Sequence, residues 1–374
     1  MERTGKKMTE TRLSEYFGEA EMHFSALILM DDLDQKISSY PSITRDFEQA
    51  LTFALRSAFG SGTAADEAHL FLQRVLYRIN RLKFFWYDDL DNYKNERSDY
   101  LRQARHRIES AWEPWELSHV KTELSVEDGD VSQQLRQRAA EDLAPPPSKE
   151  GIYFRDHMGI AGYRRLLEIA SLDGLVEASQ LSRTLAGVSN DVQAMMTRLL
   201  VEEYGGGRLS RKHSSFFSQM LKELNISALP EAHFEAVPWE VLATINHSFL
   251  LSERKRFYLR YVGGLLYTEI SVPAAFNSYR IAAERLGMSE KARAYWDLHI
   301  KEDERHGRWM LERVALPLAG MYAGKASELI IGYDQQRFMS DRAGKATAEA
   351  VKQADAGNHH VSMINFEESF EAAA

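Results

Sequence analysis

The sequence predicts an all-α protein, and three observations support this prediction. Segments rich in Leu, Ala, Glu and Arg, which are good helix formers, fill most of the chain. Apolar residues recur at helical spacing, as in the stretch 68–85, where they form a broad stripe: Leu70, Leu72, Val75, Leu76, Ile79 and Leu82. The chain has only nine prolines, and no sustained alternation of apolar and polar residues indicates a strand.

The predicted helices fall into three stretches. Residues 1–145 form an N-terminal helical region that ends at Pro145, Pro146 and Pro147, because consecutive prolines cannot continue a helix. A second helical region covers 146–340, with helices expected near 152–170, 173–187, 189–204, 208–225, 238–255, 257–286 and 289–320. Residues 341–374 form a C-terminal tail rich in Ala, Lys and Glu, which we expect to be a loose helix or disordered.

Composition excludes several classes of protein and of site. The chain has 46 Lys and Arg against 55 Asp and Glu residues, so its net charge of −9 argues against a nucleic-acid partner. It has no cysteine, so any metal must be bound by histidine and carboxylate side chains. The first residues lack the apolar core of a signal peptide, and no apolar run is long enough to span a membrane. We therefore expect a soluble cytoplasmic protein with neither a nucleic-acid nor a membrane partner.

The segment 294–311 carries three donor side chains at helical spacing. His299, Asp303 and His306 stand at positions i, i+4 and i+7, so they fall within roughly 60° of each other on one helix face. Imidazole and carboxylate together suit iron, manganese or zinc. Trp296 and Met310 extend this face with apolar side chains, which indicates that it points inward. The alternative is a charged, solvated face.

A second candidate lies around three consecutive glycines. Glu202 and Glu203 precede Gly205–Gly207, and His213 follows them. Glycine costs roughly 1 kcal/mol against alanine inside a helix, so three of them indicate a kink or a close backbone approach. Such a kink would present a Glu and a His to one point. An ordinary turn between two helices explains the same pattern.

The third candidate is Glu269, a single carboxylate in an apolar stretch. Buried carboxylates are rare unless they are paired or bind a metal. Pro273, four residues later, removes the backbone hydrogen bond to Glu269 and should kink the helix. We therefore favour a metal ligand over a structural salt bridge.

Together, three segments supply six candidate metal ligands: Glu203, His213, Glu269, His299, Asp303 and His306. Helical bundles build dinuclear carboxylate centres by projecting Glu and His side chains inward from facing helices. Oxygen and nitrogen donors of this kind suit two iron ions. We interpret the other histidines as surface or core residues: His23, His69, His106, His119, His157, His233, His247, His359 and His360.

These residues resemble the ligand pattern of the haem-oxygenase-like diiron oxidases. That pattern is a Glu followed by Tyr-Gly, a further Gly and a downstream His, then a second Glu, then His-x3-Asp-x2-His. Here it reads Glu203-Tyr204-Gly205 with Gly207 and His213, then Glu269, then His299, Asp303 and His306. Its register favours Glu203 over Glu202. The resemblance, which covers about 150 to 320, implies a haem-oxygenase-like helical bundle with two Fe(II)/Fe(III) ions and O2 as co-substrate.

Within this family, the chain most resembles the N-oxygenating branch. Its member in streptozotocin biosynthesis combines an N-terminal helical dimerisation region, a diiron domain and a C-terminal cupin. The resemblance implies a homodimer formed through residues 1–145, and we expect no cupin here. It also implies a monooxygenase of natural product biosynthesis that uses an external electron donor. Such an enzyme would N-hydroxylate the amine of an amino acid or derivative and could oxidise the nitrogen further. An arginine would hold the substrate carboxylate, with Arg208, Arg260 and Arg280 as candidates.

Other functions remain open. The same ligands would serve desaturation, cyclisation or C–C cleavage of an amino or fatty acid, and the product mass separates these reactions from N-oxygenation. A ferritin-like iron store would form a cage, which sizing detects. A haem protein would show a Soret band, and the lack of cysteine removes the nucleophile of a thiaminase-like enzyme. In a non-catalytic helical module, the substitutions His299→Ala and His306→Ala would cause no loss of bound metal and no loss of activity.

Overall fold

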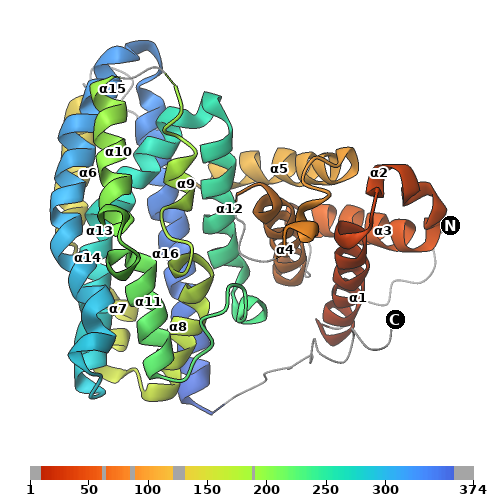
Figure 1. Cartoon of the computed structure of the whole chain (residues 1–374), viewed down its shortest axis with the longest axis horizontal. Helices are drawn as coiled ribbons and strands as arrows, with labels where there is room; N and C mark the ends of the chain where they lie inside the picture. The colour runs from red at the N-terminus through yellow and green to blue at the C-terminus, as the bar shows by residue number, and fades with distance from the viewer. Residues whose placement is uncertain (1–9, 61–64, 85–88, 121–130, 188–189, 358–374) are drawn as a thin grey trace.

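Every regular element of the computed structural model is helical within the ranges that it describes, which are residues 10–60, 65–84, 89–120, 131–187 and 190–357 (Figure 1). The predicted all-α class is therefore confirmed for these ranges. His359 and His360, which we assigned to the tail, lie outside the described residues.

The helices form two groups along the chain. The N-terminal group comprises α1 (Glu10–Leu29), α2 (Leu33–Lys36), α3 (Pro41–Ala58), α4 (Ala65–Phe84) and α5 (Asp99–His119). The second group comprises α6 (Val131–Leu143), α7 (Lys149–Ile152), α8 (Ile160–Gly174), α9 (Ser179–Ser182), α10 (Asp191–Glu203), α11 (His213–Glu223), α12 (Trp239–Glu253), α13 (Tyr258–Arg285), α14 (Glu290–Trp309), α15 (Leu316–Met321) and α16 (Ser327–Asp355). Short 3₁₀ and π turns join several of them.

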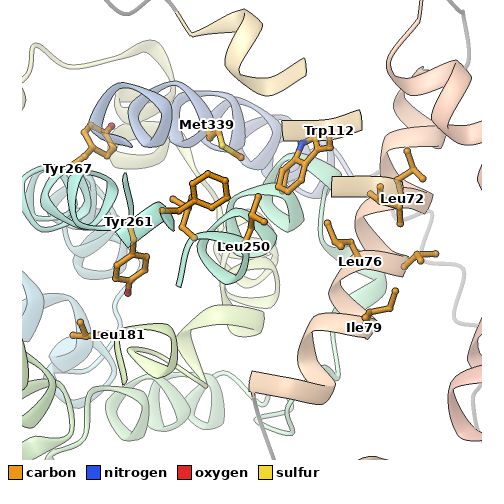
Figure 2. Close-up of a cluster of buried hydrophobic side chains, with 14 of the residues drawn as sticks. Leu72, Leu76, Ile79, Trp112, Leu181, Leu250, Tyr261, Tyr267 and Met339 are labelled. Atoms are coloured by element: carbon orange, nitrogen blue, oxygen red, sulfur yellow. The ribbon is translucent and has the colours of Figure 1, made fainter. Parts of the chain in front are cut away.

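The long helices of the second group run side by side as a bundle, and α1–α5 lie on the flank formed by α12 (Figure 1). One apolar core crosses this boundary. Leu72 and Leu76 of α4 belong to the same buried cluster as Leu250 of α12 and Met339 of α16 (Figure 2). The two groups of helices therefore share a hydrophobic core.

Helix α6 packs with the bundle although it precedes the three prolines. Its Arg138 donates a hydrogen bond to Asp334 of α16 at 2.7 Å, and its Asp142 accepts one from the Tyr333 hydroxyl at 2.8 Å. The prolines end α6 without separating it from the bundle. The change in packing therefore comes earlier in the chain than the boundary expected at residue 145, and the division of the chain into functional regions stays a prediction.

Glycines allow α13 and α16, the two longest helices, to touch along their backbones. A Cβ atom at Gly263 would lie 1.9 Å from the Leu329 carbonyl oxygen, and one at Gly332 would lie 2.0 Å from the Arg260 carbonyl oxygen. No side chain fits at such distances, so this packing depends on glycine at both positions.

The expectation of one helix over 173–187 is wrong. Helix α8 ends at Gly174, and only the single turn of α9 follows before residue 187. Ala178 between them adopts a left-handed conformation with φ of 63°, which interrupts helical hydrogen bonding. The chain reverses here, and this reversal delivers a carboxylate to the bundle interior, as described below.

The expected boundary at residue 341 falls inside α16, so the first part of the tail is neither loose nor disordered. Thr347, Ala348 and Val351 are buried against the bundle. At the end of the helix, the Asp355 carboxylate accepts hydrogen bonds from the backbone N–H groups of Gly159 at 2.9 Å and Gly162 at 2.6 Å. Asp355 therefore caps the start of α8.

No single helix in the described ranges has both the length and the apolar character needed to cross a membrane. One pair, Glu290–Met321 with Ala323–Asp355, meets the criteria only when joined, across a bend of 100°.

Candidate metal centre

The six predicted ligands converge in the middle of the bundle from four helices. Glu203 is the last residue of α10, His213 is the first of α11, and Glu269 lies midway along α13. The remaining three project from α14 (His299, Asp303 and His306). None of the six side chains is more than 11% exposed. The predicted inward face of α14 is thus confirmed as buried.

The three glycines form the turn between α10 and α11. All of them have positive φ values, of 61°, 63° and 79°, which side chains rarely tolerate. A Cβ atom at Gly205 would lie 2.3 Å from the backbone of Arg211, so the returning chain passes directly over it. The turn places Glu203 Oε2 2.8 Å from His213 Nδ1. The glycines therefore form a turn between two helices, and this same turn brings the Glu203 and His213 side chains together.

Pro273 lies within α13 without ending the helix. Because proline has no N–H group, the Glu269 carbonyl loses its usual partner four residues on. Gly307 of α14 faces this carbonyl, and a Cβ atom there would lie 3.1 Å from the Glu269 oxygen. The close approach of α13 and α14 brings Glu269 Oε2 to 3.5 Å from His306 Nδ1.

One cluster of donors forms around His299. Atoms of Glu177, Glu203, His213 and His299 that could bind a metal lie within 4.8 Å of one another. His299 Nε2 is 2.8 Å from Glu177 Oε1 and 3.2 Å from His213 Nδ1. The other ring nitrogen, Nδ1, lies 2.9 Å from the Tyr295 carbonyl, which can hold its proton. This contact leaves Nε2 free to face the cluster.

Glu177 is the donor that the sequence interpretation missed. It stands in the reversal after α8, where we expected an uninterrupted helix. The available signal was weak: a carboxylate shortly after Gly174 in a segment of small and apolar residues. Its Oε2 atom is buried and has no hydrogen-bond partner within the described residues.

A second cluster forms around Nδ1 of His306. Glu203 Oε1 lies 3.4 Å from this atom, Glu269 Oε2 3.5 Å and Asp303 Oδ1 3.6 Å. The two oxygens of Glu203 therefore face different clusters, Oε2 toward His213 and Oε1 toward His306. A carboxylate in this position can bridge two ions.

Glu202 lies on the opposite side of the His306 ring. Its Oε2 atom is 3.0 Å from His306 Nε2 and accepts a hydrogen bond from Arg305 at 2.6 Å. Arg305 also pairs with Glu302. Although Glu202, Glu302 and His306 come together here, Arg305 pairs with both carboxylates and Arg198 also pairs with Glu202. Glu202 thus orients the ring and fixes its proton on Nε2, away from the cluster at Nδ1.

The protonation of the centre follows from its crowded carboxylates. Burial alone would lower the pKa of His299, but Glu177 raises it to about 10. Burial likewise opposes the charge on His306, yet the nearby carboxylates of Glu203 and Glu269 raise its pKa to about 11. Burial, together with repulsion from Glu269, raises the pKa of Asp303 well above its usual range. In the metal-free protein, His299, His306 and Asp303 therefore hold protons at the positions where metal ions would bind.

The donor set fits a pair of divalent metal ions. His306 Nδ1 is buried among three carboxylates and satisfies no hydrogen bond with them, as expected of an atom aimed at a metal. Four carboxylates and three imidazoles are the donors that iron accepts in helical bundles.

A cavity of about 430 Å³ adjoins the centre. Its walls include Glu177, Glu203, Glu269, His299 and Asp303. None of the arginines expected to clamp a substrate carboxylate lines it. Arg260 is instead buried in ion pairs with Glu113 at 3.2 Å and Glu328 at 2.7 Å.

Part of the chain is similar to known iron-containing proteins. Residues 164–335 match the family model described as iron-containing redox enzyme. These residues, called the matched segment below, make up just under half of the chain. The segment contains all seven donors, from Glu177 to His306, and the expected haem-oxygenase-like all-α fold is confirmed.

Part of the chain is also similar to a nitrosourea synthase from Streptomyces achromogenes subsp. streptozoticus. The two proteins are 27% identical over 169 residues, which are 45% of this chain and 36% of the relative. The match thus covers about a third of the relative's length.

Proposed function

We propose that this chain is a non-haem diiron oxygenase that uses O2 to N-hydroxylate the amine of an amino acid or a derivative. The observation that carries the proposal is the position of Glu203, whose two carboxylate oxygens face two separate donor clusters. Glu177, His213 and His299 would hold one iron ion. Glu269, Asp303 and His306 would hold the other, with Glu203 between them.

Iron bound there would supply electrons and Lewis acidity for the activation of O2. The chain's own groups supply the rest. The Tyr295 carbonyl and the Glu202 carboxylate would hold protons on the outer ring nitrogens of His299 and His306. Apolar walls that include Phe217, Val272 and Phe276 would exclude water from the adjoining cavity.

Oxidation at nitrogen is supported by the similarity to a nitrosourea synthase, because a nitrosourea is an N-oxidised compound. Forming a hydroxylamine from an amine inserts one oxygen atom of O2 into an N–H bond. The second oxygen atom leaves as water and needs two electrons and two protons, so the reaction requires an external electron donor.

We also predict that the protein is a homodimer, which light scattering after size exclusion tests.

The first experiment measures iron binding and product mass together. Metal-free protein is titrated anaerobically with Fe(II), and iron is counted after desalting. We expect about two iron ions per chain for the wild type, fewer for Glu269→Ala, and an unchanged number for Glu304→Ala, whose side chain is exposed on α14.

The loaded protein then receives O2, a reductant and a panel of amines. An added oxygen atom in the product supports N-hydroxylation, and loss of two hydrogens or of a carbon fragment would identify the C–H chemistry of the alternative instead. If the wild type binds no stoichiometric iron, the proposed function is wrong.

A further inference from the structure

Apart from the proposed ligand His299, the cavity beside the metal centre is lined by acidic but not by basic side chains. Its described lining contains the carboxylates of Asp173, Glu177, Glu203, Glu269 and Asp303, and neither lysine nor arginine. Outside the metal centre, a substrate carboxylate would therefore find no cationic partner within this lining. The arrangement selects against anions and in favour of cations.

Asp173 is the carboxylate that the metal centre does not use. It lies in the last turn of α8, four residues before Glu177, and belongs to neither donor cluster. Asp173 is exposed and is one of the residues that line the cavity. Gln180 donates to it at 3.5 Å, at the limit of a hydrogen bond.

In the proposed centre, the charges of the two iron ions and their carboxylate ligands cancel, so the negative charge of Asp173 is left over. Two Fe(II) ions carry four positive charges, which the carboxylates of Glu177, Glu203, Glu269 and Asp303 balance when the imidazoles are neutral. Asp173 then remains as a single uncompensated negative charge facing the cavity. A bound cation would balance it.

Apolar side chains on three helices line another part of the cavity wall and suit an apolar stem. Leu166 and Ile169 of α8 and Val241 and Ile245 of α12 line it together with Leu265 of α13. A ligand that fits the cavity therefore combines one positively charged end with a largely aliphatic body.

We propose that Asp173 binds the protonated nitrogen of the substrate, which is an aliphatic amine or guanidine, and that no substrate carboxylate enters this cavity. This inference rests on the proposed function and names the substrate class of the same site. Binding selects the protonated base, and its deprotonation belongs to the chemical step that follows.

The test compares ligands of equal length that differ in charge. Hexylamine, hexylguanidine, hexan-1-ol and hexanoate are titrated calorimetrically into anaerobic Fe(II)-loaded protein and into metal-free protein. The wild type should bind the two cations at least about tenfold more tightly than the alcohol, and hexanoate most weakly. Asp173→Asn should reduce this preference about tenfold or more and leave the affinity for hexan-1-ol unchanged. Ser248→Ala, an uncharged change in the same lining, should leave the preference intact.

Other readouts separate the possible failures. Asp173→Asn should keep the iron content and melting temperature of the wild type, and Asp173→Ser serves as the second variant if the first is unstable. A loss of iron in these variants would make Asp173 a metal ligand and overturn the inference. An equal preference for cations in wild type and Asp173→Asn would also overturn it, whereas failure of the wild type to bind iron would count against the proposed function alone. Titration of the metal-free protein then still tests Asp173.

Discussion

Glu202 and Glu203 are neighbours in the chain, yet they contact opposite nitrogens of His306. Glu203 faces Nδ1 at 3.4 Å, and Glu202 faces Nε2 at 3.0 Å. Successive residues of a helix point about 100° apart, so two adjacent carboxylates can take different positions around one ring. The sequence pattern could favour one of them as a ligand but could not assign a task to the other.

Glu202→Ala should weaken metal binding without removing any ligand. Loss of the acceptor at His306 Nε2 frees the ring to change its tautomer, and such changes typically cost about 10–100-fold in metal affinity. Competition with a chromogenic chelator measures the affinity. Glu202→Gln, which keeps an acceptor oxygen, should reduce the metal affinity less. Glu304→Gln should leave the metal affinity unchanged, because the Glu304 side chain is exposed. Equal affinities in Glu202→Ala and wild type would argue against an orienting role.

Metal binding should release protons at neutral pH. The pKa values of about 10 for His299 and about 11 for His306 mean that both rings are protonated in the metal-free protein at pH 7.5. Metals bind neutral imidazole and ionised carboxylate, so loading should release about two protons per chain from these rings and about one more from Asp303, whose pKa is raised. Because protons compete with the metal, affinity should fall as the pH falls.

Calorimetry in two buffers of different ionisation enthalpy counts these protons. His299→Gln should release about one proton fewer, since one of the two protonated rings is gone. Loading without proton release, or affinity that rises at lower pH, would contradict the protonation state described here.

At the scale of elements, α8 depends on a residue from the far end of the described chain. Asp355→Ala removes the acceptor for two backbone N–H groups at the start of α8. Loss of a helix cap costs about 0.5–2 kcal/mol of the free energy of unfolding. Urea denaturation should show this loss in Asp355→Ala but not in Lys345→Ala, an exposed change on the same helix. Identical midpoints for both variants would exclude the capping role.

The sequence predicted most of the bundle because its helices carry clear apolar periodicity and end at recognisable glycines and prolines. It also predicted the convergence of the ligands, since helical spacing on α14 and the turn at Gly205–Gly207 are local features. Glu177 was missed because its position depends on a reversal at Ala178, a residue with no intrinsic preference for positive φ. The packing of α16 beyond residue 341 was also missed, because an Ala-rich and Lys-rich composition indicates helix but not what the helix contacts.

At the scale of the whole molecule, the contact between α13 and α16 sets the width of the bundle. Gly332→Ala would force a methyl group to 2.0 Å from the Arg260 carbonyl oxygen, and overpacking of this kind costs about 1–3 kcal/mol or more. Gly344→Ala on the same helix meets no atom within 4 Å, so it should stabilise the fold by up to about 1 kcal/mol. Thermal melts of both variants should shift in opposite directions. A shift in the same direction would mean that the two helices separate easily.

The shared core also bears on how the protein can be engineered. Helix α12 presents Thr244, Ser248 and Leu251 to the cavity, and its Asn246 is held by Asn80 and Gln73 of α4 at 3.0 and 2.9 Å. A shortened version that began at the three prolines would strip α12 of this support and leave its outer face bare. The matched segment, residues 164–335, is therefore unsuited to excision as a minimal catalyst or to transfer into a fusion protein. Any such design has to carry α4 and α5 with it.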